Sequence, residues 1–248
     1  MITKKIRALL SEFRDRDNRQ KSINEIIKAQ TIELEWAHIY HDTIRGKDWL
    51  EKLAISPGRW AGNYSFFYIL VRILADYKPR KIVEFGLGES TKLVSSFVKN
   101  ELFESTHLVL EQDQQWIDEF KARFFLSCQS IILHIPMDVI KIKEYDVNTY
   151  KEIKNKVQET FNLYIVDGPF GSERYSRYDI CFLVELLTLE DEFIIIIDDY
   201  NRIGEKDTAY DLIEQFKIKG FQIFTTVYAG NKAQIVIATT KYRFATSL

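Results

Sequence analysis

The chain has 248 residues, of which 46% are hydrophobic and 28% are charged, with only 10 glycines and 4 prolines. This composition excludes a disordered, collagen-like or low-complexity chain and predicts a globular protein. The 34 basic and 36 acidic side chains leave a net charge of -2. No overall charge therefore favours nucleic acid or an anionic membrane surface as a partner.

The two cysteines, Cys128 and Cys181, each lie among apolar residues. This setting favours buried thiols over a disulfide framework or a metal site. The N-terminal segment lacks the continuous apolar stretch of a secretory signal. The longest aliphatic run, residues 194–197, is far shorter than the roughly 20 residues that cross a bilayer. We therefore expect a cytoplasmic protein without a membrane partner.

The N-terminal part of the chain has hydrophobic residues at helical spacing. Ile23, Ile27 and Leu34 follow this period, and charged residues lie between them. Such a pattern is typical of amphipathic helices. The pattern changes at Ser56, Pro57 and Gly58, which predicts two domains. We expect a helical extension or cap over residues 1–56, which acts as a lid or as a homo-oligomer interface, and a second domain over residues 57–248.

The second part alternates strand-like runs with helical segments. The expected strands are residues 81–85, 107–111, 131–135, 162–167, 193–198, 221–228 and 234–239. The expected crossover helices are residues 90–98, 115–125, 149–160, 177–189 and 207–219. This alternation predicts an α/β fold with a mostly parallel sheet covered on both faces. Residues 229–232 are too few for a crossover helix, so the last strand should run antiparallel.

A glycine-containing turn follows the first expected strand. It contains Glu84, Gly86 and Gly88, and Ser90 and Thr91 begin the next helix. Glycines here permit a tight turn and the close approach of a nucleotide-like ligand. Thr91 replaces the third glycine of a dinucleotide fingerprint, and the spacing of a Walker loop is absent. These departures disfavour NAD(P) and P-loop sites, and an ordinary strand-to-helix loop is the alternative.

Acidic residues follow the second and third expected strands. Glu111 lies 23 residues after Gly88, where an acid accepts hydrogen bonds from both hydroxyls of a ribose. Asp138 follows the third strand, where an acid can bind an adenine amino group or cap a helix. We predict that Glu111 binds a ribose, with a solvated strand-end acid as the alternative.

Three acids follow the fourth and fifth expected strands. Asp167 ends one strand, and Asp198 and Asp199 end the other. The carboxyl ends of adjacent parallel strands meet at one edge, so these carboxylates should lie close together. Their repulsion is relieved by protonation or by a bound cation, and Mg²⁺ prefers oxygen ligands. A loop cap made by the Asp198–Asp199 pair is the alternative.

The segment of residues 167–179 is rich in polar and aromatic side chains. Arg174, Tyr175 and Arg177 belong to it, and Tyr200 follows the fifth strand. Such side chains bind hydroxyls, stack on sugar rings or pair with a carboxylate. We predict a substrate loop, and the alternative is a structural loop in which Arg174 pairs with Glu173 or Asp179.

Together, these motifs resemble the class I S-adenosylmethionine-dependent methyltransferase family over roughly residues 57–240. The resemblance implies a Rossmann-like, seven-stranded sheet in the order 3-2-1-4-5-7-6, with the last strand antiparallel. It also implies that the methionine end of the cofactor lies over Gly86 and Gly88 and that its ribose lies on Glu111. The cofactor-binding set expected on these grounds is Glu84, Gly86, Gly88, Ser90, Thr91, Glu111, Asp138 and Asp167.

The acidic cluster is similar to the metal site of cation-dependent O-methyltransferases. This resemblance implies Asp167, Asp198 and Asp199 as Mg²⁺ ligands, although Asp199 stands where that family often has Asn. The expected activity is methylation of a hydroxyl group of a small molecule or sugar, with Asp167 or Asp199 as the base. The alternatives are a noncatalytic binding or scaffold protein and, less favoured, an NAD(P)-dependent oxidoreductase.

Overall fold

The computed structural model describes residues 2–248, and it describes the side chains of residue 16 and residues 18–248. The strands are β1 (Lys81–Phe85), β2 (Thr106–Glu111), β3 (Ser130–His134), β4 (Met137–Ile142), β5 (Tyr145–Tyr150), β6 (Leu163–Val166), β7 (Ile194–Ile197), β8 (Ile223–Ala229) and β9 (Ala233–Thr239). The helices are α1 (Ile2–Ile44), α2 (Asp48–Glu51), α3 (Tyr64–Tyr77), α4 (Glu89–Asn100), α5 (Gln114–Arg123), α6 (Ile153–Lys156), α7 (Asp179–Leu183) and α8 (Ile203–Lys219), with 3-10 turns at Val184–Leu186 and Thr240–Thr246.

The large sheet has the order β3-β2-β1-β6-β7-β9-β8. Strands β3, β2, β1, β6 and β7 run parallel, and β9 runs antiparallel to both β7 and β8. Every residue of β6 and β7 is buried, as expected for central strands covered on both faces. The strand order that the sequence resemblance implies is therefore confirmed, including the antiparallel last strand.

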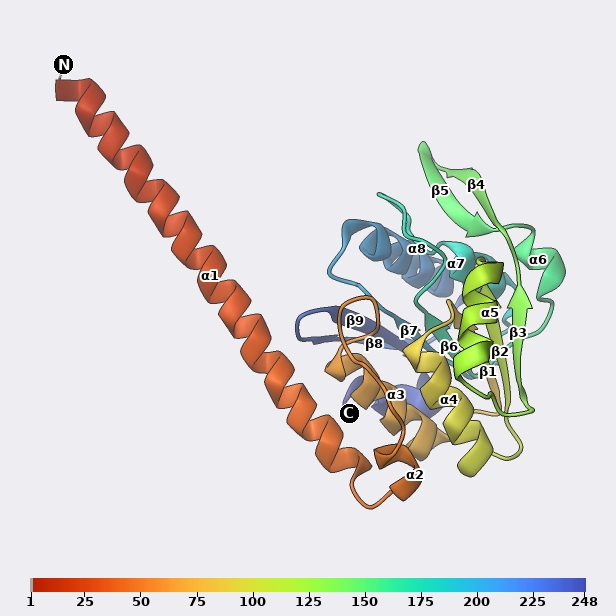
Figure 1. Ribbon diagram of the computed structural model, residues 1–248. Helices are drawn as coiled ribbons and strands as arrows, with labels where there is room; N and C mark the ends of the chain where they lie inside the picture. The colour runs from red at the N-terminus through yellow and green to blue at the C-terminus, as the bar shows by residue number, and fades with distance from the viewer. Residues whose placement is uncertain (1) are drawn as a thin grey trace.

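Helices cover both faces of this sheet (Figure 1). One hydrophobic cluster joins side chains of α1, α3 and α4 to the sheet, and a second joins those of α6, α7 and α8 to its other face. Helices α3, α4 and α5 thus cover one face and the helices after β6 cover the other, so the winding switches between β1 and β6. Ligands of open α/β sheets bind at the carboxyl edge near such a switch.

One predicted helix is wrong, and another is shorter than predicted. Instead of a helix over residues 149–160, β4 and β5 form an antiparallel hairpin, and only the short α6 follows. Apolar Tyr145 and Val147 alternate with polar Asp146 and Asn148 along β5, and this period of two favours a strand. The predicted helix over residues 177–189 shortens to α7 and one 3-10 turn. Tyr175 and Arg177 have positive φ values of 50° and 60°, so the chain becomes helical only after them.

Helix α1 is 43 residues long and projects away from the sheet, with only its C-terminal part against the rest of the molecule (Figure 1). Tyr40 and Ile44 belong to the same hydrophobic cluster as α3. Trp36 donates a hydrogen bond to the carbonyl of Ala229 at 2.9 Å. The end of α1 therefore packs into the core of the second part, while the division into domains at residue 56 stays a prediction.

The two cysteines differ in exposure. Cys181 is buried, as expected, but Cys128 is exposed, so the prediction of a buried thiol is wrong there. Cys128 lies in the short connection between α5 and β3, where flanking apolar residues do not guarantee burial. Among the helices that the structure describes, none is both long and apolar enough to cross a membrane.

Candidate functional site

The glycine turn lies between β1 and α4. Gly86 has a φ of 94°, a value that favours glycine, and a Cβ there would approach the carbonyl oxygen of Asp167 to 3.1 Å. Thr91 Oγ1 accepts a hydrogen bond from the Gly88 N–H at 3.0 Å. A Cβ added to Gly88 would meet no atom within 4 Å. The turn is thus tight at Gly86 and open at Gly88, where a ligand can approach the backbone.

Glu84 supports this turn from inside the protein. Its carboxylate accepts hydrogen bonds from Ser90 Oγ and faces His107 Nε2 at 3.0 Å. His107 in turn lies 3.2 Å from Ser130 Oγ, and all of these side chains are buried. The structure therefore places Glu84 and Ser90, both predicted to bind the cofactor, in a network that holds the start of α4.

Glu111 ends β2 beside the glycine turn. Its Oε2 accepts a hydrogen bond from the Leu87 N–H at 2.9 Å, and its Oε1 accepts from the N–H groups of Gln112 and Asp113 at 2.8 Å each. Burial raises the pKa of Glu111, and these three N–H groups oppose the rise. The side chain is only 2% exposed. Glu111 lies next to the turn as predicted, and its role toward a ribose stays a prediction.

Asp138 lies in the β4–β5 hairpin rather than at the end of a crossover. Its side chain is exposed, and its Oδ1 accepts a hydrogen bond from the Val139 N–H at 2.9 Å. It caps no helix, because β4 follows β3 directly at this point. Its proposed contact with adenine stays a prediction.

The three acids at the ends of β6 and β7 come together as predicted. One carboxylate oxygen from each of Asp167, Asp198 and Asp199 lies within 4.8 Å of the others. Asp198 and Asp199 are buried, and Asp167 is partly exposed. The parallel pairing of β6 with β7 brings these strand ends side by side.

Cationic side chains contact this acidic cluster from within. Arg177 Nη2 lies 2.9 Å from Asp167 Oδ1 and 2.8 Å from Asp199 Oδ2. Lys232 Nζ lies 3.4 Å from Asp199 Oδ1 and 3.8 Å from Asp198 Oδ2. Arg177 is 5% exposed, so its charge is compensated inside the protein. The sequence places Arg177 in a substrate loop, and the structure shows it bound to the carboxylates instead.

The surroundings shift the pKa values of the three carboxyls in different directions. Burial raises the pKa of Asp167 to about 7, with Arg177 opposing the rise and Asp198 adding to it. Burial and the neighbouring Asp199 also raise the pKa of Asp198. Burial acts upward on Asp199 as well, but Arg177 and Lys232 outweigh it and lower the pKa of that carboxyl. Of the two predicted bases, Asp167 therefore suits proton transfer near neutral pH, and Asp199 does not.

A divalent ion does not fit this arrangement of carboxylates. Mg²⁺ requires near-octahedral oxygen ligands at about 2.0–2.1 Å. Asp167 Oδ1 and Asp199 Oδ2 already face the guanidinium of Arg177, and Asp199 Oδ1 faces Lys232. An ion bound by Asp167 Oδ1 or by either oxygen of Asp199 would have to displace Arg177 or Lys232, whereas Asp198 Oδ2 has no hydrogen-bond partner among the described residues.

The other predicted substrate residues are held by the protein. Arg174 forms a bidentate pair with Asp207, and its guanidinium lies 4.9 Å from the centre of the Tyr145 ring. Tyr175 is 8% exposed and packs against Tyr145. Tyr200 is half-buried, and its N–H donates to a backbone carbonyl of β9. Arg174 is thus ion-paired, as the structural-loop alternative expects, but its partner is Asp207 rather than Glu173 or Asp179.

A buried network connects α1 to the acidic cluster. Glu33 accepts hydrogen bonds from Asn63 Nδ2 at 2.6 Å and from the Tyr64 N–H at 2.7 Å. Gln234 Nε2 donates to Asn63 Oδ1 and to Asp198 Oδ1, both at 2.8 Å. Sequence reasoning gave no role to Glu33 or Gln234. A glutamate in the middle of an amphipathic helix gives no sign that it is buried.

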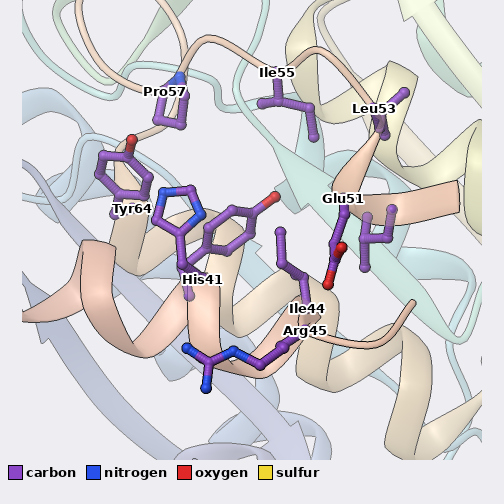
Figure 2. Close-up of a pocket in the computed structure, with 10 residues that line it drawn as sticks. His41, Ile44, Arg45, Glu51, Leu53, Ile55, Pro57 and Tyr64 are labelled. Carbon is purple, nitrogen blue, oxygen red and sulfur yellow. The ribbon is translucent and has the colours of Figure 1, made fainter. Parts of the chain in front are cut away.

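A cavity of about 310 Å³ lies where the end of α1 meets α2 and the start of α3 (Figure 2). Its wall is formed by Tyr40, His41, Ile44, Arg45, Leu50, Glu51, Leu53, Ile55, Pro57 and Tyr64. None of these side chains belongs to the acidic cluster or to the glycine turn. The Ser56 N–H donates to Glu89 Oε2 at 3.0 Å, so the segment along this cavity also touches the start of α4.

No protein-family model matches the sequence, and no curated protein matches it. Among solved structures, the chain is similar to an O-methyltransferase from Bacillus cereus in complex with SAH, with 12% identity over 83% of this chain and 90% of that one and a TM-score of 0.49. It is similar to an O-methyltransferase from Streptomyces achromogenes in complex with SAM, with 11% identity over 82% and 89% and a TM-score of 0.48. Because both TM-scores lie below 0.5, these likenesses carry no argument about activity.

Proposed function

We propose that this chain is an S-adenosylmethionine-dependent methyltransferase that acts on a hydroxyl group of a small molecule or sugar. The observation that carries the proposal is the pairing of Glu111 with the turn at Gly86 and Gly88. The turn is open at Gly88, and a carboxylate is held beside it, as the binding of an adenosyl group requires. The strand order places both features at the carboxyl edge of the sheet, next to the switch between β1 and β6.

The chemistry that follows depends mainly on positioning. The sulfonium cofactor supplies an activated methyl group, so the protein must align an acceptor oxygen with the carbon–sulfur bond and exclude water. Asp167 then accepts the hydroxyl proton at a carboxylate oxygen. With a pKa of about 7, Asp167 is partly ionised at neutral pH, and turnover should rise as the pH increases through that value.

Calorimetric titration with S-adenosylmethionine tests the proposal. We expect binding in the micromolar range and a loss of at least tenfold in affinity for Glu111→Gln. Glu104→Gln, which changes an exposed acid paired only with Arg80 across 3.3 Å, is the matched control and should bind normally. Absence of cofactor binding by the folded wild-type protein would refute the proposal, as would binding that Glu111→Gln leaves unchanged.

The same titration separates the alternatives. Binding without turnover on any hydroxylated acceptor would favour a noncatalytic binding or scaffold protein. Binding of NAD(P) in place of S-adenosylmethionine would favour an oxidoreductase. Acceptors are best supplied as a panel of sugars and small phenols, with transfer of the labelled methyl group as the readout.

We also propose that α1 pairs with α1 of a second copy of the chain. Ile23, Ile27 and Leu34 are 49%, 54% and 64% exposed, and they line one side of the projecting helix. In the sequence, Ile2, Ile6, Leu9 and Phe13 have the same three- and four-residue spacing, and the polar residues Arg16 and Gln20 separate the two apolar runs. A heptad seam of this kind is self-complementary and buries its hydrophobic residues by coiled-coil pairing.

Light scattering after size-exclusion chromatography tests this pairing. We expect a dimer for the wild type and a monomer for the double variant Ile27→Glu with Leu34→Glu. Lys28→Glu alters an exposed residue of the same helix outside the seam and should remain a dimer. A monomeric wild type at all micromolar concentrations would rule the pairing out.

A further inference from the structure

The loop that carries Arg177 is fixed to the start of α8. Ser176 is fully buried, its N–H donates to the Gly204 carbonyl at 3.1 Å, and its carbonyl accepts from Thr208 Oγ1 at 2.6 Å. Ser176 Oγ donates to Glu205 Oε1 at 3.0 Å. A Cβ on Gly204 would lie 2.8 Å from the Cβ of Ser176, so the two segments touch. The loop cannot shift without breaking these contacts.

This fixed loop directs Arg177 inward. Its Nη1 donates to the carbonyl of Asp198 at 2.9 Å, while its Nη2 binds Asp167 and Asp199. Its Nε lies 3.7 Å from Glu205 Oε1. A planar guanidinium with several donors suits this set of acceptors better than a single ammonium group would. The guanidinium therefore lies at the point where the carboxylates converge.

The local charges nearly balance without a metal ion. The four carboxylates of Asp167, Asp198, Asp199 and Glu205 face the cations of Arg177, Arg202 and Lys232. With all four carboxyls ionised, one negative charge is left over, and a proton on Asp167, whose pKa is about 7, makes the set neutral. A divalent ion added to this set would make the site positive, in surroundings where Arg177 and Asp198 are almost completely buried.

We propose that Arg177, assisted by Lys232, is the permanent cation of this cluster and takes the place of a divalent metal ion. The inference refines the proposed function, because it makes the methyltransferase independent of metal, but metal binding can be measured without any cofactor or acceptor. The surplus negative charge then favours a ligand with a single positive charge over a divalent ion.

Titration with Mn²⁺, followed by electron paramagnetic resonance, tests this inference on the full-length protein. We expect no stoichiometric Mn²⁺ binding by the wild type at micromolar concentrations, and no change in melting temperature on adding EDTA. Arg177→Met removes the cation at similar length and should bind Mn²⁺ at least tenfold more tightly than the wild type. Arg202→Met removes a half-exposed cation at the rim of the cluster and should not gain comparable affinity.

Lys232→Met provides a second route if Arg177→Met does not fold. It removes a cation from the edge of the cluster, and we expect a smaller gain in Mn²⁺ affinity. The inference is overturned if the purified wild type carries a stoichiometric divalent metal by elemental analysis. It is also overturned if the wild type binds Mn²⁺ tightly and Asp199→Asn abolishes that binding. Failure to bind S-adenosylmethionine would affect the proposed function but not this result.

Discussion

Two acidic regions lie at the same edge of the sheet, and different kinds of group bind their carboxylates. At the end of β2, Glu111 is held by three backbone N–H groups. At the ends of β6 and β7, the carboxylates are held mainly by the side chains of Arg177 and Lys232. Backbone donors are fixed once the turn has formed, but side-chain cations depend on distant segments. The groups that bind Glu111 thus come from its own turn and the neighbouring one, whereas the cations that bind the aspartates come from a separate loop and hairpin.

The largest expected effect comes from removing the cation of the second region. Arg177→Met leaves buried carboxylates uncompensated, and we expect a loss of about 3–5 kcal/mol in the free energy of unfolding. Urea denaturation measures this loss. Arg202→Met, whose side chain is 53% exposed, should cost at most about 1 kcal/mol. Equal effects of the two variants would contradict the difference between buried and exposed cations.

A third buried carboxyl has neither full backbone support nor a cation. Asp179 Oδ1 accepts a hydrogen bond from the Tyr150 N–H at 2.9 Å, but no group among the described residues binds its Oδ2. Burial raises its pKa to about 7. Because the native state then holds a proton that the unfolded state releases above about pH 4, this carboxyl lowers stability as the pH rises from about 4 to 7.

The variant Asp179→Asn should remove that pH dependence. We expect it to be more stable than the wild type by about 2–4 kcal/mol at pH 8 and to show little difference at pH 4. Urea denaturation at several pH values measures the change. Glu185→Gln, at an exposed ion pair, is the control. An unchanged pH slope in Asp179→Asn would show that Asp179 is ionised in the native state without penalty.

A substitution at Glu111 tests the region that is bound by backbone N–H groups. In Glu111→Gln, one side-chain oxygen is replaced by an amide donor that faces backbone N–H groups, so we expect a loss of about 1–3 kcal/mol in unfolding free energy. Asp118→Asn, an exposed acid on α5, should change stability little. If Glu111→Gln lowered the free energy of unfolding more than Arg177→Met, the backbone-bound carboxylate would contribute more to stability than the cation of the cluster, contrary to our expectation.

The smallest effect is expected where α1 supports the second region indirectly. Glu33→Gln keeps the length of the side chain but removes its charge, and we expect a loss of about 1–2 kcal/mol. Glu35→Gln, two residues away and exposed, should be neutral. Hydrogen exchange at the backbone amides of Tyr64 and Asn231, which donate to Glu33, should increase in Glu33→Gln alone. Unchanged protection at those amides would mean that α1 does not hold the segment before α3.

The features that the sequence predicts correctly are those set by the ends of strands, and the ones it misses depend on packing between distant segments. The glycine turn, Glu111 and the meeting of the three aspartates depend on where strands end, and strand ends are visible in the hydrophobic pattern. The positions of Arg177 and Lys232 depend instead on a loop packed on α8 and on the β8–β9 hairpin. The β4–β5 hairpin was missed because a short period of two competes with the expectation of a crossover helix.

The close approach of Gly168 to Gly86 has a consequence for how any ligand could enter. A Cβ on Gly168 would lie 2.8 Å from the backbone nitrogen of Gly86, so the two main chains are in direct contact. The two acidic regions are therefore joined by packed main chain, and the Tyr150 hydroxyl, 2.9 Å from that Cβ position, closes the contact further. A ligand at this edge therefore meets main chain that has no space to retreat where the two regions join.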